Sequence, residues 1–310
     1  MKTLHVSNAP HIHSGDTTQK IMLDVVIAML PASVAAVVIF GIQALWIMIT
    51  CVASAVLAEL LFNLACGKKS TIHDCSAVVT GLLLALNLST KVPLWQCVIG
   101  SVFAIVVVKG FFGGIGKNLV NPAIAARVLM LLTFGAVGGG ANPTLQGENV
   151  LVSGATPLEG LNNGEQSATL LQLFLGTHGG AIGETCAIAL LLGFIYLVAR
   201  KVIKWYVPAA FVGTVFACYL VFTGDATLAL SHVLAGGLLL GAIFMATDYV
   251  TTPVTNLGRV VFCVGCGLIT FYFRQFGSYP EGVSISILVM NLLVPFIERF
   301  TAKKTLGGIK

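Results

Sequence analysis

The chain has 310 residues, of which 57% are hydrophobic and only 9% are charged. Soluble globular proteins carry roughly a quarter charged residues, so this composition excludes a water-soluble globular domain. The formal net charge of +5 comes from basic residues that lie between apolar runs. No basic face carries interleaved aromatic residues, and we therefore expect no nucleic-acid partner.

The sequence predicts an all-α polytopic membrane protein with about ten transmembrane helices. Residues 1–20 form a polar tail without the apolar core of a secretory signal. Its histidines, His5, His11 and His13, are too loosely spaced for a zinc site. A span needs about 20 apolar residues. The candidate spans are 21–40, 43–65, 76–90, 92–109, 121–136, 181–199, 206–223, 228–246, 258–273 and 282–299. The third and fifth are short or polar at one end, which predicts broken or half-depth helices.

Two acidic residues stand out in the first half of the chain. Glu59 lies within the second span, and Asp74 precedes the short third helix. Acids inside a membrane are costly and are functional hypotheses by default, and their oxygen atoms suit a cation or proton pathway. The alternative is that each carboxylate is hydrated or caps a helix near a span end.

A glycine-rich stretch, 113–122, joins the fourth and fifth spans and contains Asn118 and Asn121. Glycines let a ligand approach the backbone closely, and asparagine side chains both donate and accept hydrogen bonds. The stretch is therefore either a ligand contact or a glycine turn capped by asparagine. No Gly-Lys-Ser/Thr follows the glycines, so it is not a Walker-type phosphate loop.

The segment 137–180 is too long for a simple connection and contains no Lys or Arg. It includes the run Ser153-Gly154-Ala155-Thr156 followed by Pro157. Pro157 keeps Thr156 extended, and Thr156 begins a Thr-x-x-Glu capping box with Pro at the first helical position. One interpretation is a helix N-cap. The other is that the Thr156 hydroxyl accepts a phosphate, which the free N–H groups of the helix would bind.

In the second half, Asp248 lies among threonines at the end of the eighth span, and Glu281 opens the last span. The same two interpretations apply to these acids, and Asp248 with Asp74 is the preferred pair for ion or proton handling. Cys263 and Cys266 share one helix face and could reach one metal ion. Cysteine inside an apolar run behaves as a small hydrophobe, so we expect packing, with no metal site and no disulfide framework.

The basic residues also favour one orientation in the membrane. With the N-terminus in the cytoplasm, fourteen of the 17 Lys and Arg lie in cytoplasmic segments or at span ends, and only Lys91 and Arg274 lie outside. This asymmetry predicts that both termini are cytoplasmic. The 137–180 loop then lies on the external face.

The chain is predicted to contain two inverted repeats. The expected parts are a tail 1–20, a first membrane repeat 21–136, the loop 137–180, a second membrane repeat 181–299 and a tail 300–310. Residues 80–85 (TGLLLA) are similar to 236–241 (GGLLLG), and 110–114 (GFFGG) to 274–278 (RQFGS), at offsets of 156 and 164 residues. Five spans per repeat require the second copy to be inverted, and such repeats place their site near the midplane. Chance similarity of Leu/Gly-rich helices is the alternative.

Motifs along the whole chain resemble one protein family. They are PHIHSG at 10–15, MLDV at 22–25, DCSAVVTG at 74–81, GGIGKNLVNPA at 113–123, MATDYVTTP at 245–253 and YPEG at 279–282. In order and spacing the chain is similar to the family of the Rnf complex's RnfD protein, and more distantly to the NqrB protein of the sodium-pumping NADH:quinone reductase.

This resemblance implies that a flavin transferase esterifies Thr156 with FMN through a phosphodiester, since 153–156 matches the acceptor motif. The motif usually has an acidic residue three positions before its serine, where this chain has Val150. The resemblance also implies that Asn118 and Asn121 are candidate contacts for a non-covalent riboflavin. The transferase acts outside the cytoplasm, in agreement with the predicted orientation.

The resemblance further implies a flavin-carrying subunit of a ferredoxin:NAD⁺ oxidoreductase in the bacterial cell membrane, coupled to Na⁺ or H⁺ export. Asp74, Asp248 and Glu59 are the candidate ion pathway. The chain has neither a Rossmann fingerprint nor a ferredoxin-type cysteine run, so iron–sulfur subunits, a second flavinylated subunit and other partners would supply those steps. A stand-alone permease is the alternative, and a scaffold is a third. Covalent flavin on Thr156 distinguishes among them.

Overall fold

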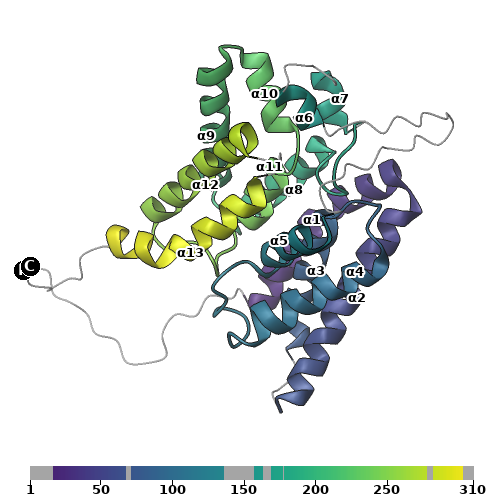
Figure 1. Cartoon of the computed structure of the whole chain (residues 1–310). Coiled ribbons are helices and arrows are strands. Elements are labelled where there is room, and N and C mark those ends of the chain that lie inside the picture. The colour runs from purple at the N-terminus through teal and green to yellow at the C-terminus, as the bar shows by residue number, and fades with distance from the viewer. Residues whose placement is uncertain are drawn as a thin grey trace, which may run out of the picture.

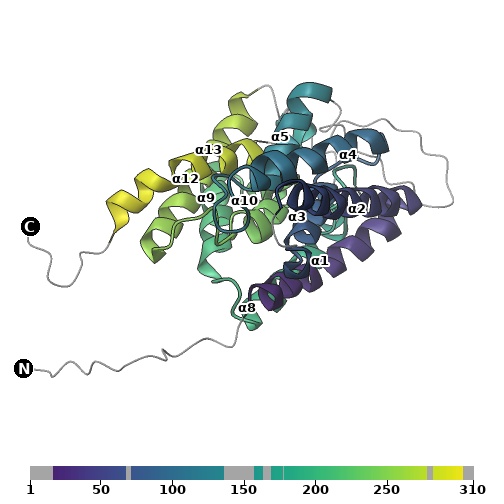
Figure 2. The same cartoon turned by 90° about the horizontal axis from the view of Figure 1, so that it is seen from below.

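The computed structural model describes residues 17–67, 71–135, 157–162, 169–176, 178–277 and 282–302, and the elements within these ranges are all helices. Two groups of helices lie side by side, α1–α5 in purple to teal and α8–α13 in green to yellow (Figure 1). The view from below shows the same separation (Figure 2).

The helices follow the chain in order. The first group consists of α1 (Thr18–Phe40), α2 (Ile42–Ala65), the 3-10 helix η1 (Ile72–Asp74), α3 (Ser76–Leu86), α4 (Leu94–Val102), the π-helix η2 (Phe103–Gly110) and α5 (Pro122–Phe134). Two short helices, α6 (Pro157–Asn162) and α7 (Leu170–Leu175), come next. The second group consists of α8 (Ala187–Ala199), α9 (Tyr206–Thr223), α10 (Ala226–Leu234), α11 (Leu238–Leu240), the π-helix η4 (Gly241–Met245), α12 (Asn256–Phe276) and α13 (Val283–Thr301).

Five of these helices, α1, α2, α9, α12 and α13, are long and apolar enough to cross a membrane. The helix α10 together with Leu238–Met245 is a sixth candidate, bent by 67° at its break. The other expected ranges contain shorter apolar helices, which are Ser76–Leu86, Leu94–Gly110, Pro122–Phe134 and Ala187–Ala199. The predicted all-α polytopic class is therefore confirmed.

The break inside a span falls between α10 and α11. Sequence analysis predicted broken or half-depth helices for the third and fifth spans, and these are the short helices α3 and α5, of 11 and 13 residues. At the break, Gly236 has a φ of +69°, a left-handed conformation that glycine adopts at little cost. The Gly236-Gly237 pair was the signal for this break.

The helix α8 begins at Ala187, later than the predicted 181, because the residues before it bind the end of α3. The N–H groups of Ile182 and Gly183 donate to the carbonyls of Leu88 and Leu86 at 2.9 and 2.7 Å. Carbonyls at a helix C-terminus have no partner within the helix. The second helix group therefore completes the hydrogen bonding of the first.

Large apolar side chains cover the outside of the helices. Val38, Leu64 and Val221 are 78%, 69% and 87% exposed. An extended apolar surface of this kind is unfavourable in water and marks a surface that contacts something apolar. Together with the long apolar helices it is suited to lipid.

The two groups meet through equivalent helices. The first helix of each group, α1 and α8, pack together, and so do the fifth, α5 and α13. A Cβ on Gly193 of α8 would clash with the Ala28 carbonyl of α1, and glycine allows this close approach, as in other membrane helix pairs. A twofold axis between inverted repeats would pair the helices in this way, and the inverted repeat stays a prediction.

Candidate functional site

A cavity, here called the first cavity, lies between the two helix groups. Its lining includes Asn118 and Asn121 from the first group, Asp248 from the second, and Lys109 at the end of η2. Three of the predicted site residues therefore share one cavity, although Asp248 lies more than 100 residues from the two asparagines in the chain. The remaining wall is mostly apolar.

Asn121 is the N-cap of α5, in agreement with the interpretation of this stretch as a glycine turn capped by asparagine. Its side-chain oxygen accepts from the N–H groups of Ala123 at 3.0 Å and Ile124 at 3.4 Å. Pro122, at the first helical position, has no N–H to satisfy. Asn121 therefore combines a capping role with a place in the cavity wall.

Asn118 is different, because its side-chain oxygen Oδ1 is buried and accepts no hydrogen bond from the described residues. The turn that presents Asn118 requires glycine, since Gly113, Gly114 and Gly116 have φ values of +105°, +94° and +88°. An unsatisfied buried acceptor is costly. It is the kind of atom that a bound polar ligand would pair with.

Asp248 follows η4 and is half-buried. Its carboxylate accepts hydrogen bonds from the Val250 N–H and the Thr251 hydroxyl, both at 3.1 Å. Removal from water raises the pKa of Asp248, and these two hydrogen bonds oppose the shift. Within the part of the chain that the structure describes, Asp248 has no ion-pair partner.

Glu59 and Asp74 line a second cavity next to the first. Lys109 lines both cavities. The preferred pair of acids, Asp74 and Asp248, thus line different cavities, and the residue on which both charges act is Tyr249. Burial raises the pKa of Tyr249, and the charges of Asp248 and then Asp74 raise it further.

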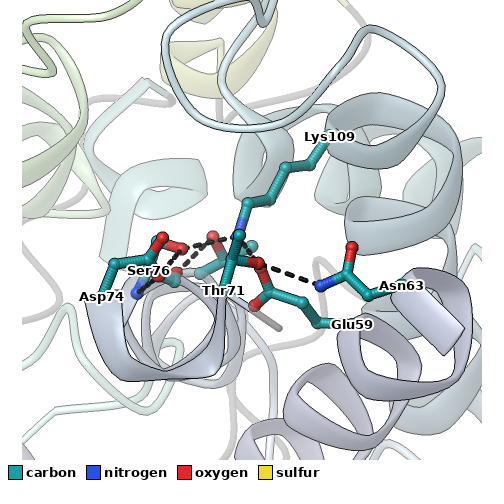
Figure 3. Close-up of polar contacts among 7 residues, drawn as sticks. Glu59, Asn63, Thr71, Asp74, Ser76 and Lys109 are labelled. Carbon is teal, nitrogen blue, oxygen red and sulfur yellow. Dashed lines mark hydrogen bonds and ion pairs between the residues drawn. The ribbon is translucent and has the colours of Figure 1, made fainter. Parts of the chain in front are cut away.

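Sequence analysis missed the role of Lys109, which it counted only as a basic residue at a span end. The Lys109 ammonium lies 2.7 Å from Glu59 Oε1 and 2.5 Å from Ser76 Oγ (Figure 3). The side chains of Lys109 and Glu59 are 6% and 5% exposed, so this is a buried ion pair. The signal available in the sequence was a lysine at the end of an apolar run together with an acid inside another.

A second buried ion pair, also missed, joins the two helix groups. Arg127 of α5 lies 3.1 Å from Glu184, which precedes α8, and donates to the side-chain oxygen of Asn87 after α3. Their side chains are almost fully buried. Asn87 in turn approaches the sulfur of Met245 at 3.8 Å, so this cluster lies where the third helices of the two groups meet.

The proposed flavin acceptor Thr156, with Ser153, Gly154 and Ala155, lies outside the described residues, as does Glu281. A helix, α6, begins at Pro157, as the capping pattern predicts. Leu158 and Leu161 of α6 are buried, and α6 packs on α10. The segment that follows Thr156 is thus fixed on the second helix group.

The remaining motif is the pair Cys263 and Cys266 in α12. Both thiols are buried. Within the described ranges, no three His, Cys, Asp or Glu side chains are grouped so that they could bind a metal ion.

An apolar outer surface, all-helical groups and ion pairs buried between the helices define a polytopic membrane protein with charged groups in its interior. The sequence model of the NQR2, RnfD, RnfE family matches residues 5–307. The chain belongs to this family, which confirms the resemblance found in its motifs.

Several relatives match the chain over nearly all of its length, and each is the D component of its complex. In Acetobacterium woodii this is a Na⁺-translocating ferredoxin:NAD⁺ oxidoreductase complex, and the identity is 44% over 99% of this chain and 96% of the relative. In Clostridium ljungdahlii it is a proton-translocating ferredoxin:NAD⁺ oxidoreductase complex, with 39% identity over 97% and 96%. In Stutzerimonas stutzeri it is an ion-translocating oxidoreductase complex, with 37% identity over 94% and 92%.

Proposed function

We propose that the chain is the membrane-embedded, flavin-carrying D component of an ion-translocating ferredoxin:NAD⁺ oxidoreductase complex. The observation that carries this proposal is the 44% identity to a protein of that description over 99% of the chain. The chain acts as one subunit, and its partners supply the NAD⁺ site and the iron–sulfur centres. It resides in the bacterial cell membrane with both termini in the cytoplasm and the 137–180 loop outside.

FMN is attached to Thr156 by a flavin transferase in this proposal. The described structure supports it through α6, which begins at the next residue and is anchored by Leu158 and Leu161. A flavin supplies one- and two-electron transfer. The role of this chain is to hold the attached group against the second helix group.

The first cavity, between the two helix groups, is the proposed site of a non-covalent riboflavin. Its walls are largely apolar, and Asn118 offers a buried acceptor without a partner among the described residues. Asn118 would therefore orient the ligand, while Asn121 is already engaged at the start of α5.

The acids beside this cavity form the proposed ion pathway, in which Na⁺ or H⁺ passes Glu59, Asp74 and Asp248. Carboxylate and hydroxyl oxygens are hard ligands suited to such cations. Asp248 is the best candidate, because within the described ranges it pairs with hydroxyl and amide groups and with no cation. In the assembled complex, Asp248→Asn is expected to lower the number of ions exported per NADH formed. An unchanged ratio would remove Asp248 from the pathway.

The proposed function is tested by whether the chain carries a covalently bound flavin. The wild-type chain, co-expressed with the transferase and denatured in a gel, is expected to fluoresce, and Thr156→Ala is expected to be dark. Thr169→Ala, in the same loop, is the matched control and keeps its fluorescence. A dark wild-type band would refute the flavin-carrying role and return the function to a permease or a scaffold.

Riboflavin is tested by the flavin that denaturation releases from the purified complex. Asn118→Leu keeps the side-chain volume but removes the acceptor, so it is expected to release less flavin while the covalent FMN is retained. Asn63→Leu changes the second cavity and serves as the control. Equal release from both variants would exclude Asn118 as a flavin contact.

A further inference from the structure

Lys109 lines both cavities. It reaches from the end of the π-helix η2 to Glu59 on α2 and Ser76 at the start of α3 (Figure 3). Lys109 and Glu59 are both nearly inaccessible, and a buried ion pair is stable only when further hydrogen bonds satisfy its groups. Such hydrogen-bond partners are present around Lys109 and Glu59.

The ammonium contacts two oxygen atoms, Glu59 Oε1 and Ser76 Oγ, and both have further hydrogen-bond partners. The Thr71 hydroxyl donates to the same Glu59 oxygen at 2.6 Å and accepts from Asn63 at 3.0 Å. Ser76, on the other side, donates to Asp74 at 3.0 Å. Carboxylate and hydroxyl oxygens are the ligands that hard cations prefer in proteins, so the ammonium occupies a position suited to a small cation.

One further ligand atom is present. The second carboxylate oxygen of Glu59, Oε2, is buried and has no hydrogen-bond partner among the described residues, and Glu59 as a whole is 4% exposed. An ammonium has only three hydrogens to donate. Thr71 is exposed, so the second cavity, which it lines with Glu59, also offers a route from solvent.

The local backbone and the neighbouring cavity allow Lys109 to leave this position. π-helical segments are frequent at functional sites, and Lys109 is the penultimate residue of η2. Gly110 and a turn of glycines with positive φ follow it. The first cavity, which Lys109 also lines, is lined by Asp248 as well.

We propose that Lys109 is a tethered cation, whose ammonium occupies a binding site for one small monovalent cation formed by Glu59, Ser76 and Thr71. The ammonium leaves that site by turning into the first cavity, where Asp248 neutralises it. One positive charge replaces another at Glu59, so no buried carboxylate is left unpaired during the exchange. Lys109 thereby controls which of the two cavities binds the mobile ion.

The first test needs only the purified full-length chain. Lys109→Met removes the ammonium and leaves the site to free cations. Its thermal unfolding temperature is expected to rise with Na⁺, relative to N-methylglucamine at the same ionic strength, until the site saturates. The wild type should show no such rise, because its own ammonium competes. The double variant Lys109→Met/Glu59→Gln should lose the response.

Lys204→Met is the matched control, since Lys204 pairs with Asn256 at an exposed position and its loss should create no Na⁺ response. If Lys109→Met shows no response to Na⁺ or Li⁺, the cation site is refuted. An equal response in the double variant would refute the assignment to Glu59.

The second test uses the assembled complex and Lys109→Arg, and it applies also where Lys109→Met fails to fold. The planar guanidinium binds a carboxylate through two parallel hydrogen bonds and is held more rigidly than an ammonium. The number of ions transported per NADH formed is expected to fall. A wild-type ratio would refute the exchange. This measurement rests on the proposed function, whereas the Na⁺ response of the purified chain does not, so the two failures are distinguishable.

Discussion

The buried pair of Arg127 and Glu184 gives the most direct test of how the two helix groups are held together. Arg127→Met keeps a long apolar side chain but removes the guanidinium that lies 3.1 Å from Glu184 and donates to Asn87. The side chain of Glu184 is 0% exposed, and its second oxygen already has no partner among the described residues. Removing Arg127 therefore leaves a fully buried carboxylate uncompensated.

The expected cost follows from this burial. Breaking a buried ion pair by removing one partner costs about 3–5 kcal/mol. The pair of Arg200 and Asp24 offers an internal comparison, because the Arg200 side chain is 56% exposed and lies 3.3 Å from the carboxylate. Exposed pairs contribute about 0–1 kcal/mol, so Arg200→Met should cost several-fold less than Arg127→Met.

The assay is equilibrium unfolding of the purified chain in mixed micelles, with both single variants and a double-mutant cycle. Glu184→Gln in the Arg127→Met background removes the uncompensated charge, so the double variant should be more stable than Arg127→Met alone. If Arg127→Met costs no more than Arg200→Met, or if Glu184→Gln gives no recovery, the pair does not stabilise the junction.

Two further substitutions test the packing and the helix ends. Gly193→Val is expected to destabilise the chain by about 1–3 kcal/mol, because its Cβ would clash with the Ala28 carbonyl. Gly213→Ala, with open space around its Cβ, should instead stabilise by about 0.5–1 kcal/mol, and equal effects in thermal unfolding would contradict the close helix contact. Asp225 caps α10 by accepting from the N–H and hydroxyl of Thr227, both at 2.8 Å, which lowers the pKa of Asp225. Its stabilisation is therefore present above the unfolded-state pKa and is lost as the pH falls through the folded-state pKa. Asp225→Ala should remove that part of the acid sensitivity in unfolding temperatures measured against pH, and an unaltered acid profile would contradict the cap.

The helices themselves could be predicted because long apolar runs leave few alternatives in a membrane. α1, α2 and α9 begin and end within three residues of the predicted 21–40, 43–65 and 206–223. The late start of α8 could not be predicted, since residues 181–186 are held by hydrogen bonds to the end of α3. Such pairing depends on a contact between the two helix groups, and apolar periodicity carries no information about it.

Some residues of the candidate site could likewise be predicted from the sequence, and others could not. The cost of an acid in a membrane singled out Glu59 and Asp248, and the side-chain chemistry of asparagine singled out Asn118. The cost of burying an acid does not identify the residue that pairs with it. Lys109 lies 50 residues from Glu59 in the chain, and a buried acid implies only that some cation or proton is near it. Thr156 rests on its motif alone, because it lies outside the described residues.

Each helix group contains a buried basic side chain near the end of its fourth helix, and the comparison of the two explains why one is lysine. Arg274 of α12 donates to the carbonyls of His232 and Ala235 at 2.6 and 3.2 Å, at the break between α10 and α11. His232 lies 156 residues after Ser76, the partner of Lys109, which is the offset between the similar segments 80–85 and 236–241. A broken helix exposes carbonyls that must be satisfied permanently inside a membrane, and the fixed donors and constant charge of arginine suit that task. In the first group the Lys109 ammonium donates to a carboxylate and a hydroxyl, which are side-chain groups and not the backbone of a broken helix. A flexible lysine can leave such partners without unmaking the fold, so the buried base near the end of the fourth helix binds the backbone of a broken helix in the second group and, in the proposed exchange, side chains that it can leave in the first.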